Sequence, residues 1–120
     1  MKENVIRDKS FAFALRIVKL AKYLEGRKRE YVLSRQVLRS GTAIGALVRE
    51  AEHAESKADF IHKMSIALKE ANESAYWLDL LYQGEYIDAE SFHSIGADCK
   101  ELIKLLTAIV KTAKVAKRSA

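Results

Sequence analysis

The sequence predicts an all-α fold, an antiparallel up-and-down four-helix bundle, and three observations support this prediction. Apolar residues recur at steps of three and four along most of the chain, which is the spacing of one helix face. The 120 residues include no proline and five glycines, too few for the frequent turns of an all-β sandwich or barrel. The length and the hydrophobic content of 49% suit a single domain, residues 1–120, with a buried core.

Turn signals divide the chain into helices that we expect at about residues 4–25, 33–55, 57–83 and 88–117. Gly26 follows the first periodic run and predicts a C-terminal cap. The segment from Ser56 to Asp59 has the residues of a capping box, which predicts the start of the third helix after a very short link. Gly84 ends the third run, and Asp88 is a good N-cap for the fourth helix.

Each predicted helix carries one apolar stripe, which we expect to face the bundle core. The stripe of the first helix contains Phe13, Ile17, Leu20 and Leu24, with Phe11, Leu15 and Val18 alongside. The second stripe contains Leu33, Val37, Gly41, Ile44, Val48 and Ala51. The third contains Phe60, Met64, Ala67, Ala71, Leu78 and Leu81. The fourth is an a/d seam over three heptads, formed by Phe92, Ile95, Cys99, Leu102, Leu106, Ile109 and Ala113.

Some residues favour close packing between helices or between subunits. Gly41 and Gly45 lie one helical turn apart, and each glycine costs about 1 kcal/mol of helix stability relative to alanine. We therefore expect another helix to approach closely there, either inside the bundle or across a subunit contact. The third helix also has more large apolar side chains than four helices can bury, which predicts a self-association surface at Tyr76, Trp77 and Leu80.

The formal net charge of +5 is unevenly distributed. Residues 1–30 hold nine Lys/Arg against four Asp/Glu, residues 61–90 two against six, and residues 91–120 six against two. Because the first and last helices are neighbours in such a bundle, we expect their positive faces to combine into one patch. The candidate nucleic-acid-binding residues are Arg16, Lys19, Lys22, Arg27, Lys28, Arg29, Arg35, Arg39, Lys111, Lys114, Lys117 and Arg118.

Aromatic side chains that could stack on bases are sparse among these basic residues, and only Tyr23 and Tyr31 are near them in sequence. We therefore expect contacts to the phosphate backbone with little reading of base sequence. A solvated basic face, and lysines that interact with the dipole of the last helix, are the alternative interpretation of the same residues.

The sequence offers no arrangement that argues for catalysis or for a bound metal or cofactor. Two acid-x-x-His pairs, which end at His53 and His62, have the spacing used by di-iron bundles, but such sites need two further acids on facing helices. Arg49 and His53 are too close for the Arg…His motif of the helical HEPN ribonucleases. Cys99 falls on the apolar seam and is expected to be a small core residue.

Targeting signals are also missing from the sequence. The start, Met1-Lys2-Glu3-Asn4, has no apolar signal core, and no stretch reaches the roughly 18 apolar residues of a membrane span. The single cysteine fits a reducing compartment. We therefore expect a cytoplasmic protein without membrane contact.

Two long segments resemble the signature of a bacterial family: residues 33–51, LSRQVLRSGTAIGALVREA, and residues 54–71, AESKADFIHKMSIALKEA. The block ESAYWLDLL, residues 73–81, continues the resemblance, which covers about residues 8–113. The sequence is similar to the small four-helix-bundle proteins first noticed as reading frames inside intervening sequences of large-subunit ribosomal RNA genes. It also resembles the accessory variability proteins of diversity-generating retroelements.

The resemblance implies a four-helix bundle that assembles into a ring-shaped homopentamer. For the retroelement branch it implies nucleic-acid binding and contact with a reverse transcriptase, whereas the role of the ribosomal-RNA branch is obscure. One departure concerns Ala43 and Leu47, where the family often has Ser and Asn, so a polar contact through that Asn is absent here.

We therefore expect a non-enzymatic homo-oligomer that binds RNA or DNA phosphates through the basic faces of its first and last helices. The alternative is a protein-interaction scaffold, for example an accessory partner of a reverse transcriptase, without a direct nucleic-acid role. No cofactor and no small-molecule substrate are expected in either case.

Overall fold

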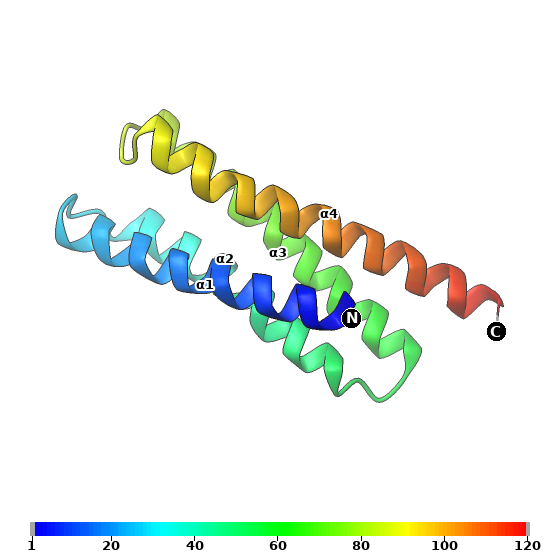
Figure 1. Cartoon of the computed structure of the whole chain (residues 1–120). Helices are drawn as coiled ribbons and strands as arrows, with labels where there is room; N and C mark the ends of the chain where they lie inside the picture. The colour runs from blue at the N-terminus through cyan, green and yellow to red at the C-terminus, as the bar shows by residue number, and fades with distance from the viewer. Residues whose placement is uncertain (1, 120) are drawn as a thin grey trace.

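The computed structural model describes the backbone of residues 2–119 and the side chains of residues 5–118. This part of the chain folds into four helices, α1 (Lys2–Gly26), α2 (Val32–Glu52), α3 (Lys57–Gln83) and α4 (Ala89–Ser119). Consecutive helices run antiparallel in an elongated bundle of 52 × 22 × 21 Å (Figure 1). The predicted all-α four-helix fold is confirmed.

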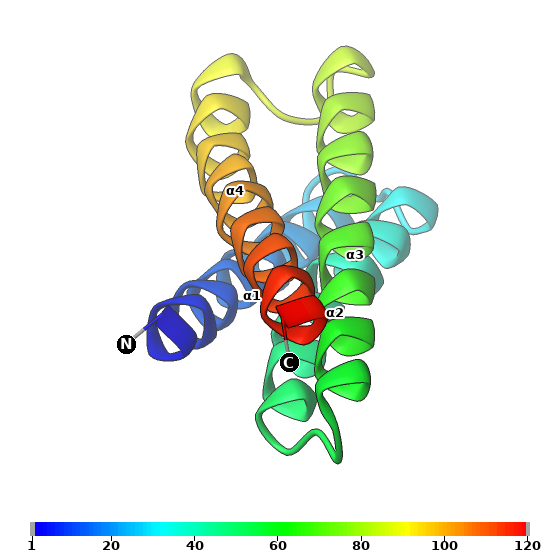
Figure 2. The same ribbon diagram turned by 90° about the vertical axis from the view of Figure 1, so that its right-hand side faces the viewer.

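The four interfaces of the bundle are unequal. α2 packs extensively on both α1 and α3, and α3 packs extensively on α4, but the interface between α1 and α4 is much smaller. Figure 2 shows α1 and α4 crossing at an angle rather than lying parallel. None of the described helices combines the length and hydrophobicity that crossing a bilayer requires.

Local hydrogen bonds start α3 and α4 at the predicted caps. Ser56 Oγ accepts a hydrogen bond from the Asp59 N–H at 3.0 Å, and the Asp59 carboxylate accepts from the Glu55 N–H at 3.2 Å. The box is therefore reciprocal, although its second bond reaches one residue beyond the cap. Asp88 Oδ1 accepts from the Ser91 N–H at 2.8 Å, which confirms Asp88 as the cap of α4.

In the turns after α1 and α3, the residue with left-handed backbone is not the glycine that the sequence suggests. Gly26 is the last residue of α1, but the positive φ of 55° belongs to Arg29, where the Glu30 N–H donates to the Leu24 carbonyl at 3.0 Å. Gly84 caps α3 with φ −79°, and Glu85 has the positive φ of 67°. Both glycines mark the helix ends correctly, while the chain reversal itself is made by charged residues.

The buried stripe follows the prediction closely in α2 and α3, where only Leu33 and Phe60 are half-buried. In α4 the predicted seam departs after Leu106, because Val110 is buried while Ile109 is half-buried. A straight helix has 3.6 residues per turn, so a seam of strict heptads drifts off the core. Ile109 and Phe60 instead line an apolar groove of about 1130 Å³ near the C-terminal end of α4. Figure 1 shows this end running past the start of α1.

Small residues bring α1 and α2 together. A Cβ atom added to Gly41 would lie 2.7 Å from Ile17 Cγ1, and one added to Gly45 would lie 3.5 Å from the Ser10 carbonyl oxygen. The close approach of Ile17 assigns Gly41 to packing inside the bundle, whereas a Cβ at Gly45 would make an ordinary contact with Ser10.

Small residues also form the contacts between α2 and α3 and between α3 and α4. Ser74 Oγ donates to Ser40 Oγ at 2.9 Å between α2 and α3, and Cys99 Sγ donates to the Ala71 carbonyl at 3.3 Å between α4 and α3. Three of the four interfaces thus share a layer of small side chains near the middle of the helices.

We expect Gly41→Ala to lower the free energy of unfolding by about 1–3 kcal/mol, because the added methyl group overlaps the stiff, β-branched Ile17. Gly96→Ala is the matched control: it also lies inside a helix, and its added Cβ meets nothing within 4 Å. The control is expected to raise stability by about 0.5–1 kcal/mol. Urea unfolding followed by circular dichroism measures both changes, and equal effects would contradict the close approach.

Candidate nucleic-acid interface

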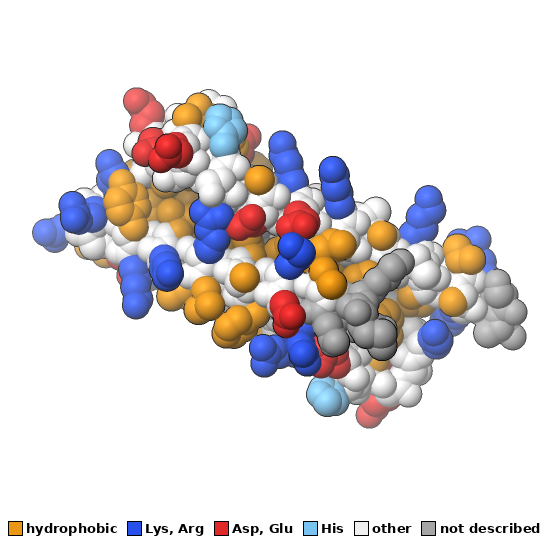
Figure 3. Space-filling model, in the orientation of Figure 1, with side chains coloured by type: hydrophobic (Ala, Val, Ile, Leu, Met, Phe, Trp, Pro, Cys, Tyr) orange, Lys and Arg blue, Asp and Glu red, His pale blue; other side chains and the backbone are white. Residues whose placement is uncertain are grey.

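Ten of the twelve basic residues predicted to bind nucleic acid occupy two ends of the bundle. The end where α1 stops and α4 begins holds the turn group, defined as Lys19, Lys22, Arg27, Lys28, Arg29 and Arg35. The opposite end holds the tail group on α4, defined as Lys111, Lys114, Lys117 and Arg118. All of these side chains are exposed, and Figure 3 shows basic side chains gathered where α1 ends and spaced along α4. The expected single patch is therefore divided into two groups.

The interface between α1 and α4 explains this division, because α4 presents acidic side chains to α1. Arg16 donates to Asp98 at 2.7 Å and to Ser94 Oγ at 2.9 Å. Lys9 pairs with Glu101 at 3.2 Å. The positive face of α1 is thus neutralised along its interface with α4 instead of being extended by α4.

A second predicted residue, Arg39, is also engaged. Its guanidinium donates to Glu70 and Glu73 on α3. Arg16 and Arg39 are about half exposed, so such pairs contribute up to about 1 kcal/mol each and are screened by salt. A phosphate would have to displace these carboxylates to reach either arginine.

The turn group and the tail group differ from Arg16 and Arg39 in their electrostatics. Among the side chains described, 5–118, none of their members forms an ion pair with an acidic residue. Their charges are therefore available to an external anion.

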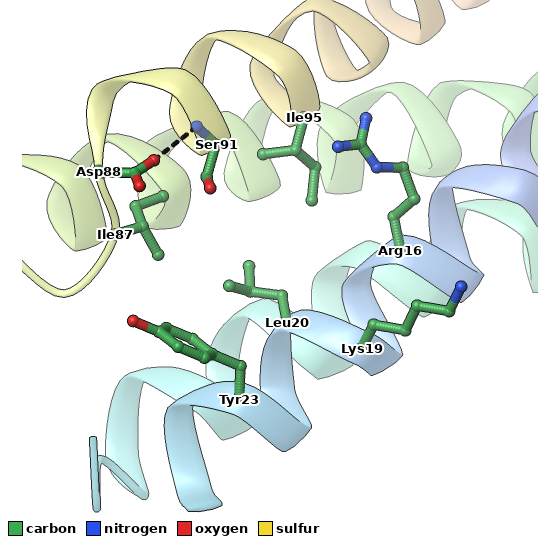
Figure 4. A pocket seen from close by; sticks show the side chains of 8 residues that line it. All are labelled: Arg16, Lys19, Leu20, Tyr23, Ile87, Asp88, Ser91 and Ile95. Carbon is green, nitrogen blue, oxygen red and sulfur yellow. Dashed lines mark hydrogen bonds between the residues drawn. The ribbon is translucent and has the colours of Figure 1, made fainter. Parts of the chain in front are cut away.

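A cavity of about 440 Å³ lies beside the turn group, between the second half of α1 and the first turns of α4. Leu20, Ile87 and Ile95 provide its apolar surface. Figure 4 shows Leu20 and Tyr23 rising from α1 toward Ile87, with the tyrosine ring closing one side. The space-filling view shows a hollow at this position between the two helices (Figure 3).

Charged groups flank the cavity from both helices. Arg16 and Lys19 border it on α1, and Asp88 and Ser91 border it where α4 begins (Figure 4). Hydrogen bonds from the backbone N–H and the side chain of Ser91 lower the pKa of Asp88 below its ordinary value. The carboxylate is therefore ionised at neutral pH, and it borders the cavity where α4 begins.

Sequence reasoning identified the parts of this site without identifying the cavity. Lys19 and Arg16 were predicted as phosphate contacts, Tyr23 as a nearby aromatic residue and Asp88 as a helix cap. Ile87 carried no signal at all, because its burial depends on how the loop before α4 folds over α1.

The cysteine and the three histidines differ in their exposure to solvent. Cys99 is buried, and the removal of its thiol from water raises its pKa to about 12, so it remains protonated. His53, His62 and His93 are exposed. Within residues 5–118, no three His, Cys, Asp or Glu side chains converge on a point where a metal ion could be held.

Comparison with known proteins gives a consistent set of matches. The family model of the 23S rRNA-intervening sequence protein matches residues 2–108. The chain is 58% identical to a protein of unknown function from the S23 ribosomal protein family of Bacteroides thetaiotaomicron, whose crystal structure it matches with a TM-score of 0.91. That match covers 92% of this chain and 99% of the other. None of the curated proteins matches.

We expect the thiol of Cys99 to react with a disulfide reagent at pH 8 at least about a hundredfold more slowly in the native protein than in urea, because burial suppresses the thiolate. The absorbance of the released thiolate measures the rate. Rapid labelling of the folded chain would contradict the assignment of Cys99 to the core.

Proposed function

The chain belongs to the 23S rRNA-intervening sequence protein family, and we propose that it is a non-enzymatic, self-assembling protein that binds the phosphate backbone of nucleic acid. The observation that carries this proposal is the exposure of the turn group and the tail group without acidic partners among the described side chains. Lysine and arginine side chains that contact phosphates release condensed counterions, which drives binding without reading sequence.

Two apolar patches support self-assembly. The α1 patch consists of Phe11 and Leu15, which are 50% and 49% exposed. The α3 patch consists of Tyr76, Trp77 and Leu80, of which Tyr76 is 58% exposed and lies edge-on to the Trp77 ring at 5.1 Å. Exposed aromatic and aliphatic clusters of this kind are typical of protein contacts.

The two patches lie on different faces of the bundle and carry opposite charges at their edges. Arg49 of α2 stacks over Phe11 at 5.2 Å, which places the α1 patch on the α1–α2 face. Glu73 accepts hydrogen bonds from both Trp77 and Arg39, which places the α3 patch on the α2–α3 face.

A contact between two unlike patches is heterologous, and when its rotation closes it produces a ring. We therefore propose that the α1 patch of one copy packs on the α3 patch of the next, in a homopentamer. A ring would repeat each basic group and strengthen binding to a long polyanion.

Leu15→Asp and Tyr76→Asp are each expected to reduce the mass of the particle in solution from about five protomers to the 13.5 kDa monomer. The reason is that assembly would then bury an aspartate without a partner in the proposed contact. Val115→Asp, a change of similar kind at another exposed apolar residue, serves as the control and should leave the mass unchanged. Light scattering coupled to gel filtration measures the mass. A monomeric wild-type chain at high concentration would refute assembly.

The affinity for RNA and for DNA is expected to fall steeply with salt, with a logarithmic slope of roughly 0.7–0.9 for each phosphate contacted. The double change Arg27→Gln with Lys28→Gln should weaken binding and make that slope shallower by roughly 1.4–1.8, because two positive charges no longer neutralise phosphates. Lys69→Gln removes an exposed charge from the acidic helix α3 and should have little effect. Filter binding across a salt series gives both quantities, and absence of binding at low salt removes the proposal.

A scaffold for a protein partner, such as a reverse transcriptase, is the second candidate. The resemblance to retroelement accessory proteins and the exposed apolar patches favour it. A protein that co-purifies with the chain and is retained after nuclease treatment, together with no affinity for nucleic acid, would favour this candidate over the first.

A further inference from the structure

We propose that the cavity between α1 and the start of α4 receives one unpaired nucleotide of the bound strand, with its base inside and its phosphate at the turn group. This inference deepens the proposed function and rests on it. The volume of about 440 Å³ falls within the roughly 300–1,000 Å³ typical of small-ligand sites.

The interior of the cavity suits the faces of a base. Ile87 and Ile95 are 7% and 5% exposed and form an apolar surface together with Leu20. Tyr23 closes one side and remains 41% exposed, so its ring offers an accessible π-face (Figure 4). Every base has such a face, and stacking on an aromatic side chain contributes to binding regardless of sequence.

The α1 side of the cavity suits the phosphate. Lys19 lies at its rim and makes no ion pair among the described side chains, so its ammonium group is available. Lys22 lies one turn further along α1, and Arg27 follows at its end, so a strand leaving the cavity meets further positive charge. Arg16 differs, because Asp98 and Ser94 hold its guanidinium as part of the wall.

The opposite side of the cavity suits the edge of a base that carries an amino group. Asp88 lines this side, and although its Oδ1 accepts the Ser91 N–H, a carboxylate can accept several hydrogen bonds and donates none. Cytosine, adenine and guanine present an exocyclic amino group to such an acceptor, whereas uracil has a carbonyl oxygen in place of the cytosine amino group and one N3–H between two carbonyl oxygens that repel a carboxylate. The site is therefore expected to prefer the amino-bearing bases to uracil.

The same geometry excludes paired bases. A base in a duplex is stacked on both faces and hydrogen-bonded along its edge, so it reaches a pocket between two helices only after extrusion, which costs a few kcal/mol. Backbone contacts by the turn group and the tail group carry no such restriction. Binding to the cavity thus adds a preference for single strands to a general affinity for phosphates.

The test measures fluorescence anisotropy of labelled oligocytidine, oligouridine and an RNA duplex of equal length with the full chain. Tyr23→Ala is expected to weaken oligocytidine binding roughly tenfold or more and to leave duplex binding unchanged. Tyr23→Phe keeps the ring and should restore binding. Tyr31→Ala removes a tyrosine of similar exposure, 45%, near the same basic end but outside the cavity, so an equal loss of oligocytidine binding there would place base stacking outside the cavity and contradict the inference.

Asp88→Asn tests the edge contact separately, because asparagine also caps helices and α4 should still form. Its amide both donates and accepts, so the preference for oligocytidine over oligouridine should fall toward equality. Equal binding of single strands and duplex by the wild type, unaltered by Tyr23→Ala, would overturn the inference and leave phosphate binding standing. Absence of binding to all three nucleic acids would instead overturn the proposed function.

Discussion

The spacing of three helix pairs depends on small residues that meet near the middle of the bundle. Gly41 leaves room for Ile17 between α1 and α2, and the hydroxyl groups of Ser40 and Ser74 share a hydrogen bond between α2 and α3. The Cys99 thiol donates to a carbonyl of α3. In the described part of the chain no buried side-chain nitrogen or oxygen lacks a partner, so this polar layer is fully satisfied.

The fourth interface is built on a different principle, and the candidate site follows from it. Two pairs of long side chains bridge α1 and α4, Arg16 to Asp98 and Lys9 to Glu101. Long bridges hold two helices further apart than interlocked small residues do. The remaining space becomes a cavity between apolar and charged walls, beside the exposed turn group.

Features encoded locally were predictable from the sequence. The caps at Ser56 and Asp88 require only residues three positions away, and the stripe of α2 is regular because α2 packs on a helix at each side. The whole fold class follows from such regularities. Even so, heptad counting predicted that Ile109 is buried, whereas Val110 is the buried residue, because an α-helix drifts relative to a strict seven-residue repeat.

Features that depend on distant partners were not predictable. Arg16 pairs with a residue 82 positions away and Arg39 with residues 31 and 34 positions away, so their neutralisation left no trace in the local pattern. The cavity needs the crossing of α1 and α4 and the fold of the loop at Ile87, neither of which periodicity determines. The surplus of apolar residues on α3 was visible, whereas the exposure of Phe11 and Leu15 depended on how α1 rotates in the bundle.

The ion-paired interface between α1 and α4 separates the part of the molecule that maintains the fold from the part that would determine which ligand binds. Side chains exposed along α1 and α4 tolerate substitution at small energetic cost, whereas the layer around Gly41 does not. Relatives of this chain could therefore diverge in what they recognise by changing a few surface positions, and one inherited scaffold could serve different ligands without rebuilding its interior.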